Sequence, residues 1–150
     1  MRIAGLDIGQ RRIGIAISDP TKLLARPLDT LRVGGLDVAS IDALIEVLAE
    51  LSREDDGLER VVVGLPRRLD GTPNEMTAKV EGFAHRLEKR LGVPVVLQDE
   101  RLTSREAESR LAQREKDWRV RKARLDAAAA AIILQDYLDA NPSSAAENPR

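Results

Sequence analysis

The chain of 150 residues suits one globular domain, and its 43% hydrophobic and 33% charged residues are typical of such a domain. No apolar run approaches the roughly 20 residues that span a bilayer. An aspartate lies inside the apolar start of the chain, so we expect neither a membrane span nor a signal peptide. The absence of cysteine excludes disulfides and cysteine-ligated zinc, which favours a cytoplasmic location.

The net charge of −1 argues against nucleic-acid binding by the surface as a whole, but the basic residues are unevenly distributed. Six arginines and lysines lie from Arg114 to Arg124, against two acids in the same tract. We expect this basic tract to border a site that binds phosphate groups. Trp118 lies inside the tract, where its indole either stacks on an unpaired base or anchors the segment to the core.

Three strands are predicted at the start of the chain. Residues 1–8 form a short apolar run that ends at Gly9, and residues 12–18 alternate isoleucine with small side chains. A link of about three residues between the two runs permits only an antiparallel hairpin. A third strand at 24–31 follows the turn at Asp19, so we expect a three-stranded antiparallel meander.

After the meander, hydrophobic residues recur at helical spacing, and helices alternate with strands. The predicted elements are a helix at 37–52, a strand at 60–65, a helix that ends at Gly92 and a strand at 93–98. For the second helix, Thr72 is the expected N-cap, with Pro73 at the first helical position and Glu75 completing a capping box.

Two further helices are predicted at 103–114 and 125–138. Residues 139–150 contain two prolines, two serines and no apolar cluster, so we expect a disordered tail after a folded domain at 1–138. Strands joined through helices lie parallel by right-handed crossovers. The predicted fold is therefore α/β, with a mixed five-stranded sheet (a three-strand antiparallel meander plus two parallel strands) flanked by helices.

Asp7 is an unusual residue for its position. It lies in a strand that we expect to be buried on both faces, and an unpaired carboxylate there costs several kcal/mol. Asp7 must therefore be protonated, bound to a cation, or paired with Arg11 or Arg12 of the hairpin. The glycines on either side, Gly5 and Gly9, let another backbone or a phosphate approach closely.

Other acids are expected near the same end of the sheet. Asp99-Glu100 follows the fifth strand at its carboxyl end, although a solvated loop is the alternative. Asp126 lies on a largely apolar face of the last helix, but it also suits the N-cap of that helix. Gathered carboxylates raise one another's pKa, and Mg²⁺, which prefers oxygen ligands, relieves this repulsion. Two such ions about 3.5–4 Å apart would suit hydrolysis of a phosphodiester.

Five sequence blocks, in order and spacing, closely resemble the YqgF (RuvX) family over about residues 1 to 138. The blocks are 5–9 (GLDIG), 12–19 (RIGIAISD), 63–71 (VGLPRRLDG), 99–103 (DERLT) and 125–134 (LDAAAAAIIL). The resemblance implies a ribonuclease H-like fold, similar to that of Holliday-junction resolvases, and a nuclease that matures the 5′ end of pre-16S rRNA in bacteria. It also implies Asp7, Glu100 and Asp126 as catalytic, metal-binding acids, with Glu100 preferred over Asp99 and with Mg²⁺ or Mn²⁺ as the metal.

Basic residues beside these acids are expected to bind the substrate, because guanidinium groups suit phosphate oxygens. The candidates are Arg12, Arg67, Arg68, Arg101, Arg121 and Lys122. The resemblance leads us to expect a single basic or neutral residue where this chain has Arg67-Arg68, so family contacts in this loop do not transfer directly. A solvated loop is the alternative there. His85, the only histidine, is expected on an exposed helical face without a catalytic role.

Other functions are open at this stage. An ATPase of the actin and sugar-kinase type also opens with a hairpin that contains Asp-x-Gly. Such an ATPase binds nucleotide between two lobes, however, and 150 residues supply only one. No Walker lysine motif is present either. A non-catalytic RNA-binding or ribosome-assembly factor would not require the three acids. A Holliday-junction resolvase acting on branched DNA needs a dimer that cuts two strands symmetrically, whereas we expect a monomer or a weak homodimer.

Overall fold

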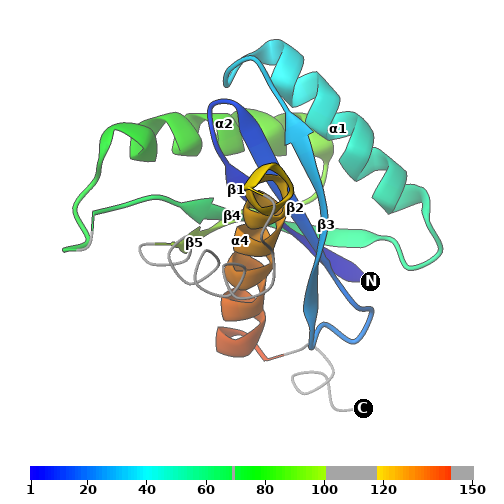
Figure 1. Ribbon diagram of the computed structural model, residues 1–150. Coiled ribbons are helices and arrows are strands. Elements are labelled where there is room, and N and C mark those ends of the chain that lie inside the picture. The colour runs from blue at the N-terminus through cyan, green and yellow to red at the C-terminus, as the bar shows by residue number, and fades with distance from the viewer. Residues whose placement is uncertain (69, 101–117, 143–150) are drawn as a thin grey trace.

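The computed structural model describes residues 1–68, 70–100 and 118–142, with the backbone alone at 118–125. The helices and strands of these ranges are labelled in Figure 1. They are β1 (Arg2–Ile8), β2 (Arg12–Ser18), β3 (Ala25–Arg32), α1 (Val38–Arg53), β4 (Leu58–Leu65), α2 (Glu75–Leu91), β5 (Val95–Asp99) and α4 (Trp118–Ala140). The predicted helix at 103–114 lies outside the described residues.

The strands form one mixed sheet of five, in the order β3-β2-β1-β4-β5. β1, β2 and β3 are antiparallel neighbours, whereas β4 and β5 run parallel to β1. The predicted meander with two added parallel strands is therefore confirmed. Because β1 is the central strand, its carboxyl end lies beside the carboxyl end of β4, and next to that comes the end of β5.

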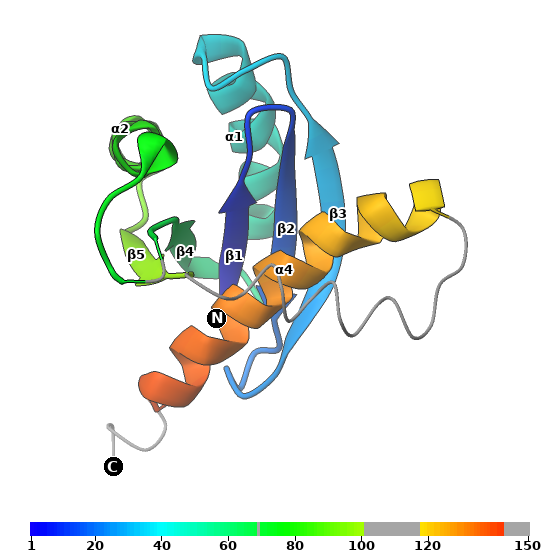
Figure 2. The ribbon, with the colours of Figure 1, turned by 60° about the vertical axis from the view of Figure 1, so that its left-hand side comes forward.

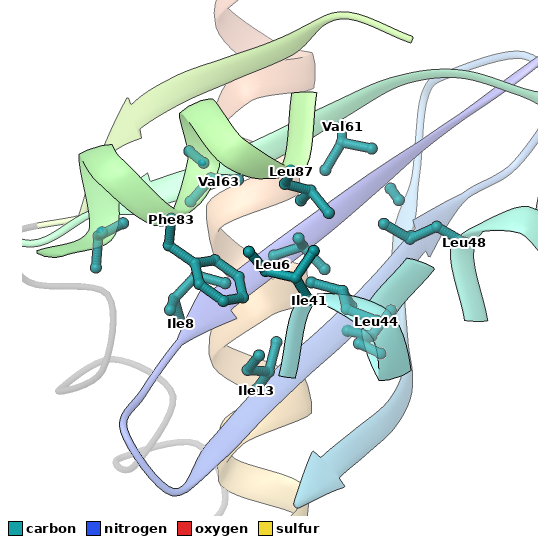
Figure 3. Packing of buried hydrophobic residues seen from close by; sticks show 14 of the residues in the cluster. Leu6, Ile8, Ile13, Ile41, Leu44, Leu48, Val61, Val63, Phe83 and Leu87 are labelled. Atoms are coloured by element: carbon teal, nitrogen blue, oxygen red, sulfur yellow. The ribbon is translucent and has the colours of Figure 1, made fainter. Parts of the chain in front are cut away.

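Helices α1 and α2 cover one face of the sheet, and α4 crosses the opposite face (Figure 1, Figure 2). The first face holds the larger core, shown in Figure 3, to which the strands contribute alternate residues. Leu6 and Ile13 of the sheet, Leu44 of α1, and Phe83 and Leu87 of α2 are fully buried there. Each such side chain stabilises the fold by about 1.5–3 kcal/mol.

The sheet has glycines where α4 lies closest to it. A Cβ at Gly5 would lie 2.7 Å from the Cβ of Leu134, and a Cβ at Gly14 would lie 1.9 Å from the backbone oxygen of Asp126. A methyl group cannot occupy either place, so these glycines let α4 lie directly on the backbone of β1 and β2. This close packing determines where Asp126 sits relative to the sheet.

Helix α4 is longer than predicted, because it already includes Trp118, seven residues before the predicted start at 125, and ends at Ala140 instead of residue 138. The basic tract carries no periodic apolar residues that would indicate a helix, although arginine and lysine are good helix formers. Residues 139 and 140 therefore belong to the helix and not to the predicted tail, of which 143–150 lie outside the described residues. No helix in the described ranges is both long and apolar enough to cross a membrane.

The N-cap of α2 is Asn74, so the prediction of Thr72 as the cap is wrong. The side-chain oxygen of Asn74 accepts from the backbone nitrogens of Met76 and Thr77, and the Thr77 hydroxyl accepts from the backbone nitrogen of Asn74. Thr77 thus replaces Glu75 in the capping box. The Thr72 hydroxyl is already engaged, because it donates to Asp70 Oδ1 at 2.7 Å.

Candidate active site

Asp7 lies near the carboxyl end of β1, and its neighbour on each of the two adjacent strands is a glycine. Its partner across the antiparallel ladder is Gly14 of β2. On the other side, Gly64 of β4 follows the residue that pairs with Leu6. Because side chains alternate along a strand, Asp7 shares the α4 face with Gly5. Its carboxyl group therefore projects into a space bounded by bare backbone on both sides.

Glu100 enters this space from the end of β5. Its backbone nitrogen donates to the carbonyl oxygen of Leu65 at 3.3 Å, which extends the parallel pairing by one residue and fixes where its side chain starts. A Cβ at Gly64 would lie 2.9 Å from Glu100 Oε2 and 2.5 Å from the Cδ1 of Ile133. Gly64 thus provides the room that both Glu100 and α4 occupy.

Asp7 and Glu100 form a hydrogen-bonded carboxyl pair. Burial raises the pKa of Asp7 to about 6; the hydrogen bond with Glu100 opposes this rise and the charge of Asp126 adds to it. Burial also raises the pKa of Glu100 to about 9, helped by the charge of Asp7, their hydrogen bond and the charge of Asp99. Two close carboxyl groups do not ionise independently, so the pair keeps one proton near neutral pH.

Asp126 lies well inside α4 and forms an ion pair with Arg12, whose Nε donates to Asp126 Oδ2 at 2.7 Å. The interpretation of Asp126 as an N-cap is therefore wrong, because helical residues precede it. The alternative in which Arg12 pairs with Asp7 is not the arrangement found. Asp126 is close enough for its charge to raise the pKa of Asp7.

The donor chemistry of the carboxyl pair fits a divalent cation. Glu100 Oε2 is buried and has no hydrogen-bond partner among the described residues, and a buried oxygen without a partner is costly. Mg²⁺ and Mn²⁺ prefer such oxygens. Within the described ranges, however, no group of three or more potential ligands is arranged to hold a metal ion. The structure thus brings Asp7 and Glu100 together and leaves Asp126 beside them, bonded to Arg12.

The other predicted site residues differ in how closely they approach the acids. Arg67 Nη1 lies 3.9 Å from Asp99 Oδ2, a loose ion pair beside the end of β5. Arg68 is exposed, and its backbone closes the loop by a 2.9 Å bond from its nitrogen to the oxygen of Thr72. His85 is exposed on α2, as predicted.

Three predicted substrate contacts lie wholly or partly outside the described residues. Arg101 lies outside the described residues. The backbone of Arg121 and Lys122 belongs to the first part of α4, and the later part of this helix crosses the sheet face that carries the acids (Figure 2). Their side chains lie outside what the structure describes.

Two features of the site escaped the sequence analysis. The first is the pairing of Arg12 with Asp126, which no spacing rule indicates. The second is the role of Gly14 and Gly64, each of which lies inside a strand of β-branched residues. A glycine in such a strand often marks a close approach of another backbone, and that signal was available at both positions.

These features define a class of protein, a ribonuclease H-like domain with a carboxyl pair at the ends of its central strands. The fold is similar to that of Thermus thermophilus RuvC in complex with Holliday junction substrate, with a TM-score of 0.53 and 16% identity over 95% of this chain and 98% of that one. It is also similar to Fowlpox virus resolvase in complex with Holliday junction DNA, with a TM-score of 0.59 and 13% identity over 95% and 100% of the two chains. Likenesses at such low identity establish the fold.

Sequence comparison identifies the family. A family model described as "RuvX: Holliday junction resolvase" matches residues 1–140. A protein of Anaeromyxobacter dehalogenans (strain 2CP-1) named "Putative pre-16S rRNA nuclease" is 45% identical over 141 residues, which cover 93% of this chain and 97% of the relative. A protein of the same name from Syntrophus aciditrophicus is 44% identical, with 93% and 89% covered. The chain therefore belongs to the RuvX family, which confirms the resemblance drawn from its sequence.

Proposed function

We propose that this protein is a divalent-metal-dependent nuclease that hydrolyses RNA phosphodiesters and matures the 5′ end of pre-16S rRNA in the cytoplasm. The carboxyl pair of Asp7 and Glu100 carries the proposal, because a buried carboxyl oxygen without a partner among the described residues, beside a second carboxyl group, offers the oxygen ligands that a divalent cation prefers. The names of the relatives from Anaeromyxobacter and Syntrophus support pre-16S rRNA as the substrate.

Asp7 and Glu100 are the proposed primary ligands, and Asp126 is the third. When bound, one or two Mg²⁺ or Mn²⁺ ions supply Lewis-acid activation of the phosphoryl group and of the attacking water. The three carboxyl groups come from β1, from the end of β5 and from α4, so the ligands depend on the packed fold and not on one local segment. Gly14 and Gly64 keep that space open for them.

The proposed substrate contacts lie around this centre. Arg12 and Arg67 both pair with acids beside it, and Arg68 is exposed on the same loop as Arg67. Their guanidinium groups would neutralise phosphate oxygens of the RNA. Arg101 and the basic residues Arg121 and Lys122 would extend this contact along the RNA.

Cleavage of precursor 16S rRNA in the presence of Mg²⁺ or Mn²⁺ tests the proposal. Wild type should cut, and both Asp7→Asn and Glu100→Gln should lose most of the activity, because each removes a negatively charged ligand. Asp99→Asn is the matched control, since it neutralises the neighbouring acid outside the pair and should keep most of the activity. Equal cutting by wild type and Asp7→Asn would reject the catalytic role of the pair.

Resolution of Holliday junctions is the second candidate, favoured by the description of the matching family model and by the fold of the DNA-bound resolvases. This activity needs a symmetric dimer, whereas we propose a monomer or a weak homodimer whose folded domain, predicted to end at residue 138, extends to the end of α4 at Ala140. A precursor rRNA and a four-way DNA junction should be offered together, with gel filtration of the protein alongside. Preferential cutting of the junction by a dimer would replace the rRNA proposal.

A further inference from the structure

The ion pair between Arg12 and Asp126 is partly buried, and it engages the third acid of the proposed site. The two side chains are 27% and 24% exposed, and Nε of Arg12 lies 2.7 Å from Oδ2 of Asp126. Solvent screens such a pair less than it screens a surface pair, so the attraction between the charges is retained. Removing the charge of Arg12 takes an attractive charge away from Asp126 in a partly desolvated place.

Backbone contacts fix the positions of both Arg12 and Asp126. The nitrogen of Gly9 donates to the oxygen of Arg12 at 2.9 Å and closes the hairpin between β1 and β2. The backbone oxygen of Asp126 rests on Gly14, which lies two residues after Arg12 and therefore on the same face of β2. The pairing thus follows from the way in which α4 packs on the sheet, and it is not a chance meeting of two flexible side chains.

A cation held by Asp7 and Glu100 would also bind the carboxylate of Asp126, which Arg12 already engages. The charge of Asp126 raises the pKa of Asp7, so the two carboxyl groups are close enough to interact. Nevertheless, no three-ligand group exists in the described part of the chain while Asp126 is bonded to Arg12. The guanidinium group and the cation are both positively charged, and they would share one carboxylate at a cost in mutual repulsion.

We propose that Arg12 competes with the divalent cation for Asp126, so that the ion pair weakens cation binding until another anion draws the guanidinium group away. The inference rests on the proposed function, which assigns Asp7, Glu100 and Asp126 as ligands. A phosphodiester oxygen is an anion of the right kind, because arginine binds phosphate as readily as carboxylate. By linkage, a phosphate that takes Arg12 from Asp126 strengthens cation binding by the same factor by which the cation strengthens phosphate binding.

Binding of Mn²⁺ to the protein without RNA, measured by electron paramagnetic resonance, tests the competition. Arg12→Met keeps an unbranched side chain as far as the position of Nε and removes the charge and the donors, and it should lower the Kd for Mn²⁺ at least about fivefold, the lower end of ordinary coupling between sites. Arg12→Lys keeps the charge but not the planar fork, so its Kd should lie between those of wild type and Arg12→Met. Arg11→Met is the matched control, because Arg11 is the exposed neighbour in the same hairpin, and it should change the Kd much less.

A double-mutant cycle with Asp126→Asn separates competition from a general effect of charge. In that background Arg12 has no carboxylate to hold, so Arg12→Met should leave the Kd for Mn²⁺ unchanged. Circular dichroism confirms that each variant is folded before its Kd is compared.

The possible results distinguish this inference from the function on which it rests. Mn²⁺ binding that depends on Asp7 but is unchanged or weaker in Arg12→Met would overturn the competition alone. A gain in affinity that persists in the Asp126→Asn background would also overturn it, because Arg12 would then act by charge without Asp126. A failure of wild type and every variant to bind Mn²⁺ would overturn the proposed function and the competition together.

Discussion

Replacement of Asp7 by asparagine is expected to stabilise the metal-free protein at pH 8, although the same change removes a proposed cation ligand. Burial raises the pKa of Asp7 from its ordinary value of 3.8 to about 6. Since one pKa unit corresponds to about 1.4 kcal/mol, ionised Asp7 lowers the free energy of unfolding by about 3 kcal/mol. Asparagine has nearly the same shape, carries no charge and can donate a hydrogen bond to Glu100.

The advantage of the asparagine variant should depend on pH. A group whose pKa is raised by folding stabilises the folded protein at low pH, and this stability is lost as the pH rises through the folded-state pKa. Metal-free wild type should therefore lose stability between about pH 4 and pH 6 through Asp7, and at higher pH through Glu100, whose pKa is raised to about 9. Asp7→Asn lacks the first of these losses, so its advantage should be small near pH 4 and full at pH 8.

Urea unfolding followed by circular dichroism at pH 4 and pH 8, with a chelator present, measures this difference. Adding Mg²⁺ should then stabilise wild type by mass action and stabilise Asp7→Asn much less. Asp56→Asn, a change to an exposed loop acid, is the control and should shift neither curve. The reasoning fails if Asp7→Asn is less stable than wild type at pH 8 in chelator, or if its advantage is the same at both pH values.

Three further changes test the packing of α4, the start of α2 and the basic tract. Gly14→Ala should lower the free energy of unfolding by about 1–3 kcal/mol, because α4 must move away from β2; an unchanged melting temperature would contradict the close approach. Asn74→Ala should cost about 1 kcal/mol in thermal unfolding and Thr72→Ala clearly less, so the reverse order would restore Thr72 as the cap. Charge reversal of Arg121 and Lys122 should weaken RNA binding and flatten its salt dependence, because fewer counterions are released; an unchanged salt slope would place the RNA elsewhere.

Local patterns in the sequence were sufficient for most of the fold. Alternating isoleucines at 12–18 and the short link before them predict the hairpin, because side chains on a strand alternate between two faces. Gly92, which ends α2 in the left-handed conformation with φ of 86°, was equally recognisable as a helix end. These features depend on residues a few positions apart, so the chain order alone contains them.

Elements whose ends depend on distant contacts were predicted less well. Nothing local in residues 118–124 distinguishes a helix from a loop, and the helix there continues into a segment that packs on Gly5 and Gly14. At α2, Thr72 and Asn74 are both acceptable caps by type. The competing bond of Thr72 with Asp70 decides between them.

The candidate site shows the same difference between features set by local sequence and features set by distant contacts. The sequence by itself determined that Asp7 lies in a buried strand and that Glu100 follows a strand end, because apolar runs delimit both strands. It could not determine the partner of each acid, since Arg12 was an equally suitable partner for Asp7. Arg12 and Asp126 are 114 positions apart, and their ion pair exists because glycines in β1 and β2 admit α4 onto the sheet. Only the tertiary structure decided that pairing, because electrostatic attraction acts between groups that packing has already brought together.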